Sequence, residues 1–228
     1  MFNSIFKSVR VATFLVLSLY LSTGYAQQRF SAGPRLGVNL SKFGGNVEKN
    51  NFHPGFVGGV FLMYSSLNHF GISADALYAQ RGAEFRVQRP NGSTLTYDQR
   101  INYLEIPVAL RYFLTLNGNF RPNIFFGPSL GFKLNAKSNR DSNISSDNSN
   151  AFSAADLGLL AGFQLNWKGF GDRQRFLIDA RYTYGLSDVT ALPIPGGIDN
   201  QRINNSTITL TLGYGFGIGR EYPSRYRK

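Results

Sequence analysis

Strict alternation of apolar residues with small or polar ones is the feature that most constrains this chain. It is clearest in residues 203–219, where one face carries Ile208, Leu210, Leu212, Tyr214, Phe216 and Ile218. The other face carries Thr207, Thr209, Thr211, Gly213, Gly215, Gly217 and Gly219. A period of two is that of a β-strand with one apolar face, and helical spacing does not fit it.

Seven further segments repeat this pattern, so we expect eight strands, several of them long for a soluble sheet. Their predicted ranges are 29–41, 55–64, 70–87, 99–113, 122–134, 153–167, 174–186 and 203–219. The second strand is ambiguous, because two sets of residues compete for its apolar face. One set is Val57, Gly59, Phe61 and Met63, and the other is Phe56, Gly58, Val60 and Leu62.

The connections between these segments alternate between short and long. Those near 65–69, 114–121 and 168–174 are short, whereas those near 42–54, 88–98, 135–152 and 187–202 are longer and polar. Outer-membrane barrels have short periplasmic turns and longer external loops, and chain ends on the same side require an even strand number. The predicted fold is therefore all-β: an eight-stranded antiparallel up-and-down transmembrane β-barrel. We expect the Ser/Asn/Asp-rich stretch 135–153 to be a solvated, mobile loop.

The first 26 residues have the features of a secretory signal peptide. Lys7 and Arg10 give a positive start, residues 11–21 are mostly apolar, and Gly24 and Ala26 are small residues at a cleavage site. The apolar run is shorter than the ~20 residues that span a bilayer. We expect residues 1–26 to be removed after export by the general secretory route. Residues 27–219 would then form the barrel in the cell outer membrane, and 220–228 a basic periplasmic tail.

The charges on the polar face decide which face points inward. They nearly balance, although the whole chain has a formal net charge of +11. An unpaired buried charge is expensive, and the interior of an eight-stranded barrel is just wide enough to be filled by side chains. We therefore predict a lumen ion network, with a soluble barrel whose polar face is wet as the alternative. Its members would be Arg35, Asp75, Arg81, Glu105, Arg111, Lys133, Asp156, Asp179 and Arg181.

Residues suited to catalysis are few. The chain has no cysteine, which excludes disulfides, thiolate zinc sites and cysteine nucleophiles. Its two histidines, His53 and His69, are expected at opposite rims and cannot share a metal or a dyad. His53 with Asp98 or a loop serine is the candidate for a hydrolase or acyltransferase, a remote alternative. Glu105 with Asp75 or Asp179 is better explained as structural ion pairs, because nearby arginines keep carboxylates ionised. We expect no enzyme activity, catalytic residue, metal or cofactor.

Several short motifs occur along the predicted strands, and the main one is Tyr103-Leu-Glu-Ile-Pro-Val-Ala-Leu-Arg-Tyr112. Others are Gly37–Leu40, Gly55-Phe56, Leu77-Tyr-Ala-Gln-Arg-Gly82, Gly127-Pro-Ser-Leu-Gly131 and the glycine- and aromatic-rich last strand. Together these motifs resemble those of the PorT-type outer-membrane β-barrel proteins of Bacteroidota. The resemblance implies an outer-membrane barrel of about eight strands. The namesake of the family is linked to a secretion system for gliding and for export of surface proteins.

Two functions remain open at this point. The first is a non-enzymatic barrel with a largely closed lumen, acting through its loops or periplasmic rim in envelope integrity or as a PorT-like secretion accessory. The second is a narrow porin for ions or small solutes. Expected partners are outer-membrane lipid and lipopolysaccharide, the barrel-assembly machinery during biogenesis, and a secretion-system or periplasmic protein. Nucleic acid is not expected, because the positive charge is not gathered on one stripe.

Overall fold

The computed structural model describes residues 30–45, 50–66, 68–88, 94–116, 118–140, 144–171, 173–189 and 203–218. The predicted signal peptide and the predicted basic tail lie outside these residues. Nearly all of the described chain is strand, and among the described residues no helix is long and apolar enough to cross a membrane. The elements are β1 Phe30–Gly45, β2 Asn50–Ser65, β3 Phe70–Gln88, β4 Thr94–Phe113, β5 Asn123–Arg140, β6 Ile144–Asp147, the helical turn η2 Ser149–Ala151, β7 Ala155–Lys168, β8 Gln174–Gly185 and β9 Ile203–Ile218.

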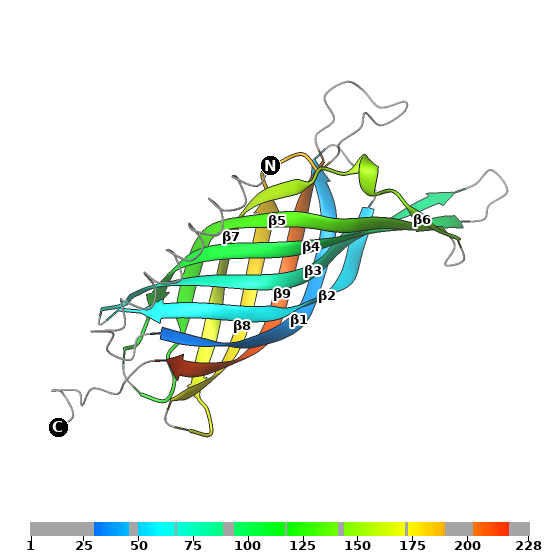
Figure 1. Cartoon of the computed structure of the whole chain (residues 1–228). Coiled ribbons are helices and arrows are strands. Elements are labelled where there is room, and N and C mark those ends of the chain that lie inside the picture. The colour runs from blue at the N-terminus through cyan, green and yellow to red at the C-terminus, as the bar shows by residue number, and fades with distance from the viewer. Residues whose placement is uncertain are drawn as a thin grey trace, which may run out of the picture.

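Eight long strands close into an antiparallel barrel, as Figure 1 shows. Each long strand pairs with the next along the chain, and β1 pairs with β9 from Phe30↔Ile218 to Gly45↔Ile203. The short strand β6 only extends the outer end of β5, so β7 takes the next place in the barrel. Because β4 also pairs with β5, the sheet has no open edge. The predicted fold is confirmed.

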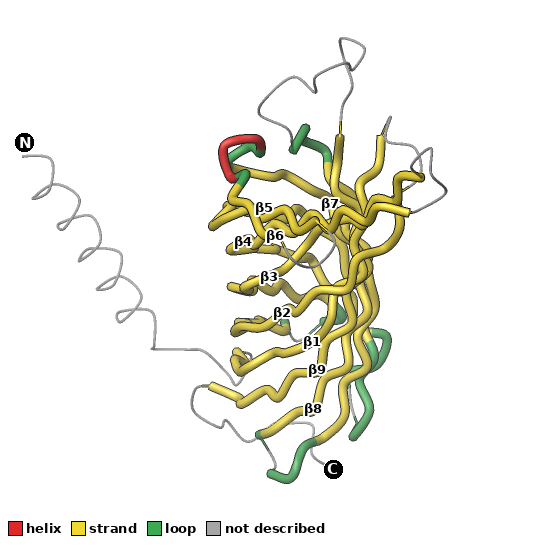
Figure 2. The backbone as a smooth tube through the Cα atoms, turned by 90° about the vertical axis from the view of Figure 1, so that its right-hand side faces the viewer, coloured by secondary structure: helices red, strands yellow, loops and turns green. Residues whose placement is uncertain are grey.

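Short connections gather at one end of the barrel, which we call the short-turn rim. The described residues 66, 68–69, 114–116, 118–122, 169–171 and 173 form it, and Phe30, which pairs with both Tyr64 and Ile218, marks the beginning of β1 there. The opposite end, the hairpin rim, holds the far ends of the same strands, together with β6 and η2 (Figure 2).

The predicted bounds of three of the four long loops were wrong, because the strands continue into them, whereas the predicted loop 187–202 agrees with the end of β8 and the beginning of β9. β1 runs to Gly45, β2 begins at Asn50, and β5 continues to Arg140 and pairs with β6. Part of the stretch 135–153, predicted to be a mobile loop, is therefore a hairpin. A strand of 16 residues, tilted by about 40°, rises about 40 Å along the axis, whereas the lipid-facing band is about 25 Å tall. Beyond that band, backbone hydrogen bonds still pair the strands, but no alternation of side chains is required.

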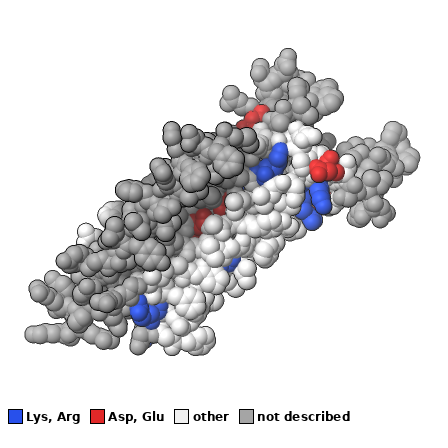
Figure 3. Space-filling model, in the orientation of Figure 1, with Lys and Arg blue, Asp and Glu red and all other residues white. Residues whose placement is uncertain are grey.

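The two faces of the barrel wall are inverted relative to a soluble protein. Outward side chains such as Val60, Phe126 and Leu212 are 57%, 62% and 54% exposed, while Arg35 and Asp179 are 1% exposed. In the face shown in Figure 3 the wall is largely uncharged, and the coloured side chains lie mainly toward its two ends. The ambiguous strand β2 is also resolved. Its inward side chains are Val57, Phe61 and Met63, and its outward ones are Phe56, Val60 and Leu62.

Candidate functional site

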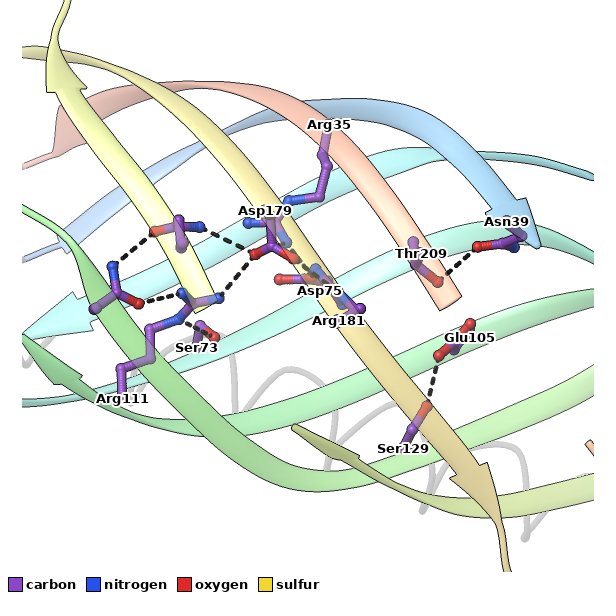
Figure 4. A network of polar contacts seen from close by, with 12 residues as sticks. Arg35, Asn39, Ser73, Asp75, Glu105, Arg111, Ser129, Asp179, Arg181 and Thr209 are labelled. Atoms are coloured by element: carbon purple, nitrogen blue, oxygen red, sulfur yellow. Dashed lines mark hydrogen bonds and ion pairs between the residues drawn. The ribbon is translucent and has the colours of Figure 1, made fainter. Parts of the chain in front are cut away.

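A layer of charged side chains crosses the lumen nearer the short-turn rim, and Asp179 of β8 lies at its centre (Figure 4). Oδ2 of Asp179 accepts from Arg35 of β1 at 3.0 Å, and Oδ1 accepts from Nε of Arg181 at 3.0 Å. Asp75 of β3 receives the same two arginines, each at 3.1 Å. Two carboxylates and two guanidinium groups therefore form one cluster that joins three strands.

Arg111 of β4 extends this first layer to the other side of the barrel. Its NH2 group lies 3.7 Å from Oδ2 of Asp179, and its remaining donors bind Ser73 and Asn123, each at 2.8 Å. Asn123 in turn donates to Gln164 at 3.1 Å, and Gln164 donates back to Asp179 at 3.2 Å. The first layer thus links six strands: β1, β3, β4, β5, β7 and β8.

A second layer lies nearer the hairpin rim and is organised by Arg81 of β3. Arg81 contacts Glu105 of β4 at 2.7 Å and Asp156 of β7 at 3.2 Å. Glu105 also accepts from Ser129 at 2.7 Å, and Asp156 accepts from Asn205 of β9 at 2.8 Å. Through Asp156, these bonds connect β9 with Arg81 of β3 on another part of the wall.

Lys133 does not join either layer. Its Nζ donates to the main-chain oxygens of Ser149 and Phe152, and among the described residues it has no carboxylate partner. The prediction placed Lys133 in the ion network because it has the correct alternation phase. The chain after β6 folds back over the end of β5 and brings backbone carbonyls within reach of the ammonium group instead.

The remaining charges of the two layers balance. In the described lumen, the first layer holds three cations and two anions, and the second holds one cation and two anions. All of these side chains are at most 6% exposed. Removing one partner of such a buried pair leaves an uncompensated charge, so the members depend on one another.

Aromatic rings stack on the lumen arginines, a feature that the sequence pattern did not reveal. The guanidinium carbon of Arg35 lies 5.0 Å from the ring centre of Phe61, and that of Arg111 lies 4.4 Å from Phe125. Such cation–π contacts stabilise a desolvated cation by about 2 kcal/mol. Inward aromatic residues on otherwise polar strand faces were the signal that could have identified them.

Apolar clusters fill the lumen on both sides of the charged layers. Toward the short-turn rim, Phe61, Met63, Phe113 and Leu177 pack together with Leu116. Toward the hairpin rim, a larger cluster packs against Phe152; its members are Phe43, Ala83, Ile101, Tyr103, Ala136, Val189 and Ile203. The described lumen is thus filled by side chains over most of its length.

The candidate catalytic pair lies at the hairpin rim, in strands and not in loops. Nδ1 of His53, in β2, lies 2.8 Å from Oδ1 of Asp98 in β4. This contact lacks the geometry of a hydrogen bond, since Oδ1 of Asp98 has no hydrogen-bond partner among the described residues. Nε2 of His53 has no hydrogen-bond partner there either. The nearby hydroxyl of Ser41 bonds to the main-chain oxygens of His53 and Gly82. A nucleophile must lie within hydrogen-bond reach of its base, and the described residues supply none at Nε2.

An apolar outer belt around a filled, ion-paired lumen defines a membrane-spanning β-barrel. Residues 25–191 match the family model of the outer membrane protein beta-barrel domain. The chain belongs to this family, whose members are proteins of the outer membrane. Among curated proteins no sequence match was found.

Solved structures with the same architecture support the fold. Neisserial surface protein A (NspA) is 14% identical with a TM-score of 0.50, and the match covers 83% of this chain and 97% of that one. The outer membrane protein OprG from Pseudomonas aeruginosa is 12% identical with a TM-score of 0.53, covering 87% and 99%. At these identities the likeness shows a shared barrel fold alone.

Proposed function

We propose that this protein is a non-enzymatic outer-membrane barrel with a largely closed lumen, which acts through its hairpins or its short-turn rim. Its role would be in envelope integrity or as a secretion accessory of the PorT type. The observation that carries the proposal is the pair of charged layers around Asp179 and Arg81, which lie between apolar clusters. In this proposal the apolar belt contacts outer-membrane lipid and lipopolysaccharide after insertion by the barrel-assembly machinery.

The contacts of the layers oppose solute passage. A hydrated ion moving along the axis would have to separate Asp179 from Arg35 and Arg181, and Arg81 from Glu105. These partners are buried, so separating them leaves charges that nothing else neutralises. The interior of an eight-stranded barrel is just wide enough for its side chains to fill it.

A narrow porin is the second candidate, and β9 is the observation that favours it. The lumen side of β9 carries small residues, and the hydroxyl groups of Thr207 and Thr211 have no hydrogen-bond partner among the described residues. Buried hydroxyls without a protein partner often bind water. A single file of water along β9 would make a path for small ions without opening the charged layers.

Conductance in a planar lipid bilayer separates the two candidates. We expect the purified mature protein to give no stable single-channel steps, with a known trimeric porin in the same bilayer as the positive control. Large, stable steps would refute the closed lumen and support the porin. Thr211→Val, which removes one lumen hydroxyl, would then be expected to reduce the steps, whereas Leu210→Val on the lipid face would not.

The cellular role is tested by deleting the gene. Loss of surface-protein export with normal detergent resistance would support the secretion accessory, and detergent sensitivity with normal export would support envelope integrity. The PorT-like motif at residues 103–112 supports the first of these. If both properties are unchanged, the proposed role is refuted.

We also propose that the short-turn rim faces the periplasm and that the signal peptide ends at Ala26, as the sequence indicates. The intact mass of the protein from outer membranes should correspond to a chain that begins at Gln27. Protease added to whole cells should cleave only at the hairpin rim. Cleavage confined to residues 66–69 or 114–122 would reverse the orientation.

A further inference from the structure

A pocket of about 160 Å³ lies at the short-turn rim. Its lining includes Ser31, Met63, Phe113, Arg121, Asn166 and Arg175. Ser31 and Arg175 have the same alternation phase as the lumen residues Arg35 and Asp179, respectively, so these positions face the interior. The pocket therefore opens within the mouth of the barrel, away from the lipid-facing wall.

Three arginines, Arg121, Arg173 and Arg175, line this pocket, and its described lining holds no carboxylate. Among the described residues, neither Arg121 nor Arg175 has an ion-pair partner. Arg175 donates to the main-chain oxygen of Asn119 at 3.4 Å. The guanidinium carbon of Arg121 lies 5.1 Å from the centre of the Phe113 ring. Nε of Arg121 is buried and has no hydrogen-bond partner in this part of the chain. Burial lowers the pKa of Arg121, and the like charge of Arg175 lowers it further. An anion placed between the two would relieve that repulsion.

Asn166 adds an acceptor to these donors. The residue is 2% exposed, and its Oδ1 atom has no hydrogen-bond partner among the described residues. An amide oxygen accepts a hydrogen bond and cannot donate one, so a ligand that bonds to it must carry a proton. Inorganic phosphate carries both anionic oxygens and a P–OH group at neutral pH, whereas a phosphate monoester, with a second pKa of about 6, is mainly the dianion without that proton. Sulfate and phosphodiester lipid headgroups carry no such proton.

We propose that the pocket binds inorganic hydrogen phosphate, entering from the short-turn side. Arg121 and Arg175 donate to the anionic oxygens, as guanidinium groups do at phosphate sites, and Asn166 accepts from the P–OH group. The C-terminal residues 220–228 contain four cations and one anion, so their charge does not suit this pocket.

Calorimetry with inorganic phosphate tests the site in the full mature protein, held in uncharged detergent at neutral pH and low salt. We expect saturable binding of phosphate, with sulfate at least tenfold weaker. Arg121→Gln and Arg175→Gln should each weaken phosphate binding at least tenfold. Lys137→Gln, an exposed charge change at the hairpin rim, is the matched control and should bind phosphate as the unmodified protein does.

Asn166→Leu separates the hydrogen-bond argument from charge attraction, since it should remove the preference for phosphate over sulfate. Sheet content by circular dichroism and heat-dependent mobility in gels should stay unchanged in every variant scored. Absence of binding at millimolar phosphate, equal affinity for sulfate, or unaltered binding in both arginine variants would overturn the proposal. Competition by anionic phospholipid in nanodiscs would overturn it in favour of a lipid headgroup.

This inference deepens the proposed function and rests on it only in taking the short-turn rim as a binding surface. The two can fail separately. Phosphate binding together with single-channel steps would leave the phosphate site standing and refute the closed lumen. Absence of single-channel steps together with absence of phosphate binding would leave the closed lumen standing and refute the phosphate site.

Discussion

Replacing Asp179 by Asn tests whether the first charged layer stabilises the barrel. Asp179 accepts from Arg35 and Arg181 at 3.0 Å and from Gln164 at 3.2 Å. Asparagine keeps the shape of the side chain but removes its negative charge. The three arginines of the layer then face Asp75 alone, in a site that is 1% exposed to solvent at Asp179.

The expected magnitude follows from the loss of one partner of a buried pair, which costs about 3–5 kcal/mol. With a denaturant slope of about 2 kcal/mol per molar urea, the unfolding midpoint should fall by about 1.5–2.5 M. Adding Arg35→Gln to Asp179→Asn restores the net charge of the layer. The double variant should therefore lose less stability than the two single losses together, by about 0.5–3 kcal/mol.

Urea unfolding in lipid vesicles measures this change, with tryptophan fluorescence as the signal. The chain has one tryptophan, Trp167, at the end of β7, and its ring lies 5.1 Å from that of Phe120. Asp147→Asn is the control, because Asp147 is exposed in β6 and lies outside the lumen layers. If the midpoint of Asp179→Asn falls no further than that of Asp147→Asn, the layer does not hold the barrel together.

Two further predictions concern the lipid face and the hairpin rim. Leu212→Arg places a charge on the outward face of β9 and should destabilise the barrel by about 2–4 kcal/mol in the same assay. The control Leu212→Ile should not destabilise it. Equal unfolding midpoints for the two variants would contradict the assignment of Leu212 to the lipid face. Hydrogen bonds from the side chain and backbone of Ser149 hold the pKa of Asp147 below its ordinary value. The stability that these hydrogen bonds contribute is fully present at pH values above the ordinary pKa of aspartate. It is lost as the pH falls through the lowered pKa of Asp147. In an NMR titration, Ser149→Ala should raise this pKa part of the way back, and an unchanged titration would show that the bond is absent.

Alternation alone was sufficient to predict β9 and its two faces. One face of this strand contacts lipid and the other packs against polar groups in the lumen, so apolar residues such as Leu210 must alternate with polar ones such as Thr209. The sequence could also suggest that the lumen charges balance. It could not show that Arg35 meets Asp179, 144 residues away, because that pairing depends on strand register. Register is set by turns and irregularities, such as the shift between Phe52 and Val57 in β2.

The prediction was wrong at positions where contacts within the folded chain, and not the membrane, determine the structure. Lys133 has the phase of a lumen residue, yet its partners are the carbonyls of Ser149 and Phe152, which only the folded hairpin brings near. The strand ends at the hairpin rim were missed for a related reason. Paired backbones outside the lipid band tolerate Asn, Ser and Asp in any order, so the pattern carries no information there.

The first layer also constrains how this chain enters a bilayer. Arg35 belongs to the first strand of the barrel and Asp179 to the seventh, β8, so the two meet only when β1 has joined β9, the neighbour of β8. A sheet inserted before that joining would expose bare guanidinium groups to hydrocarbon. Insertion and closure should therefore be concerted, with no stable half-open form in the membrane.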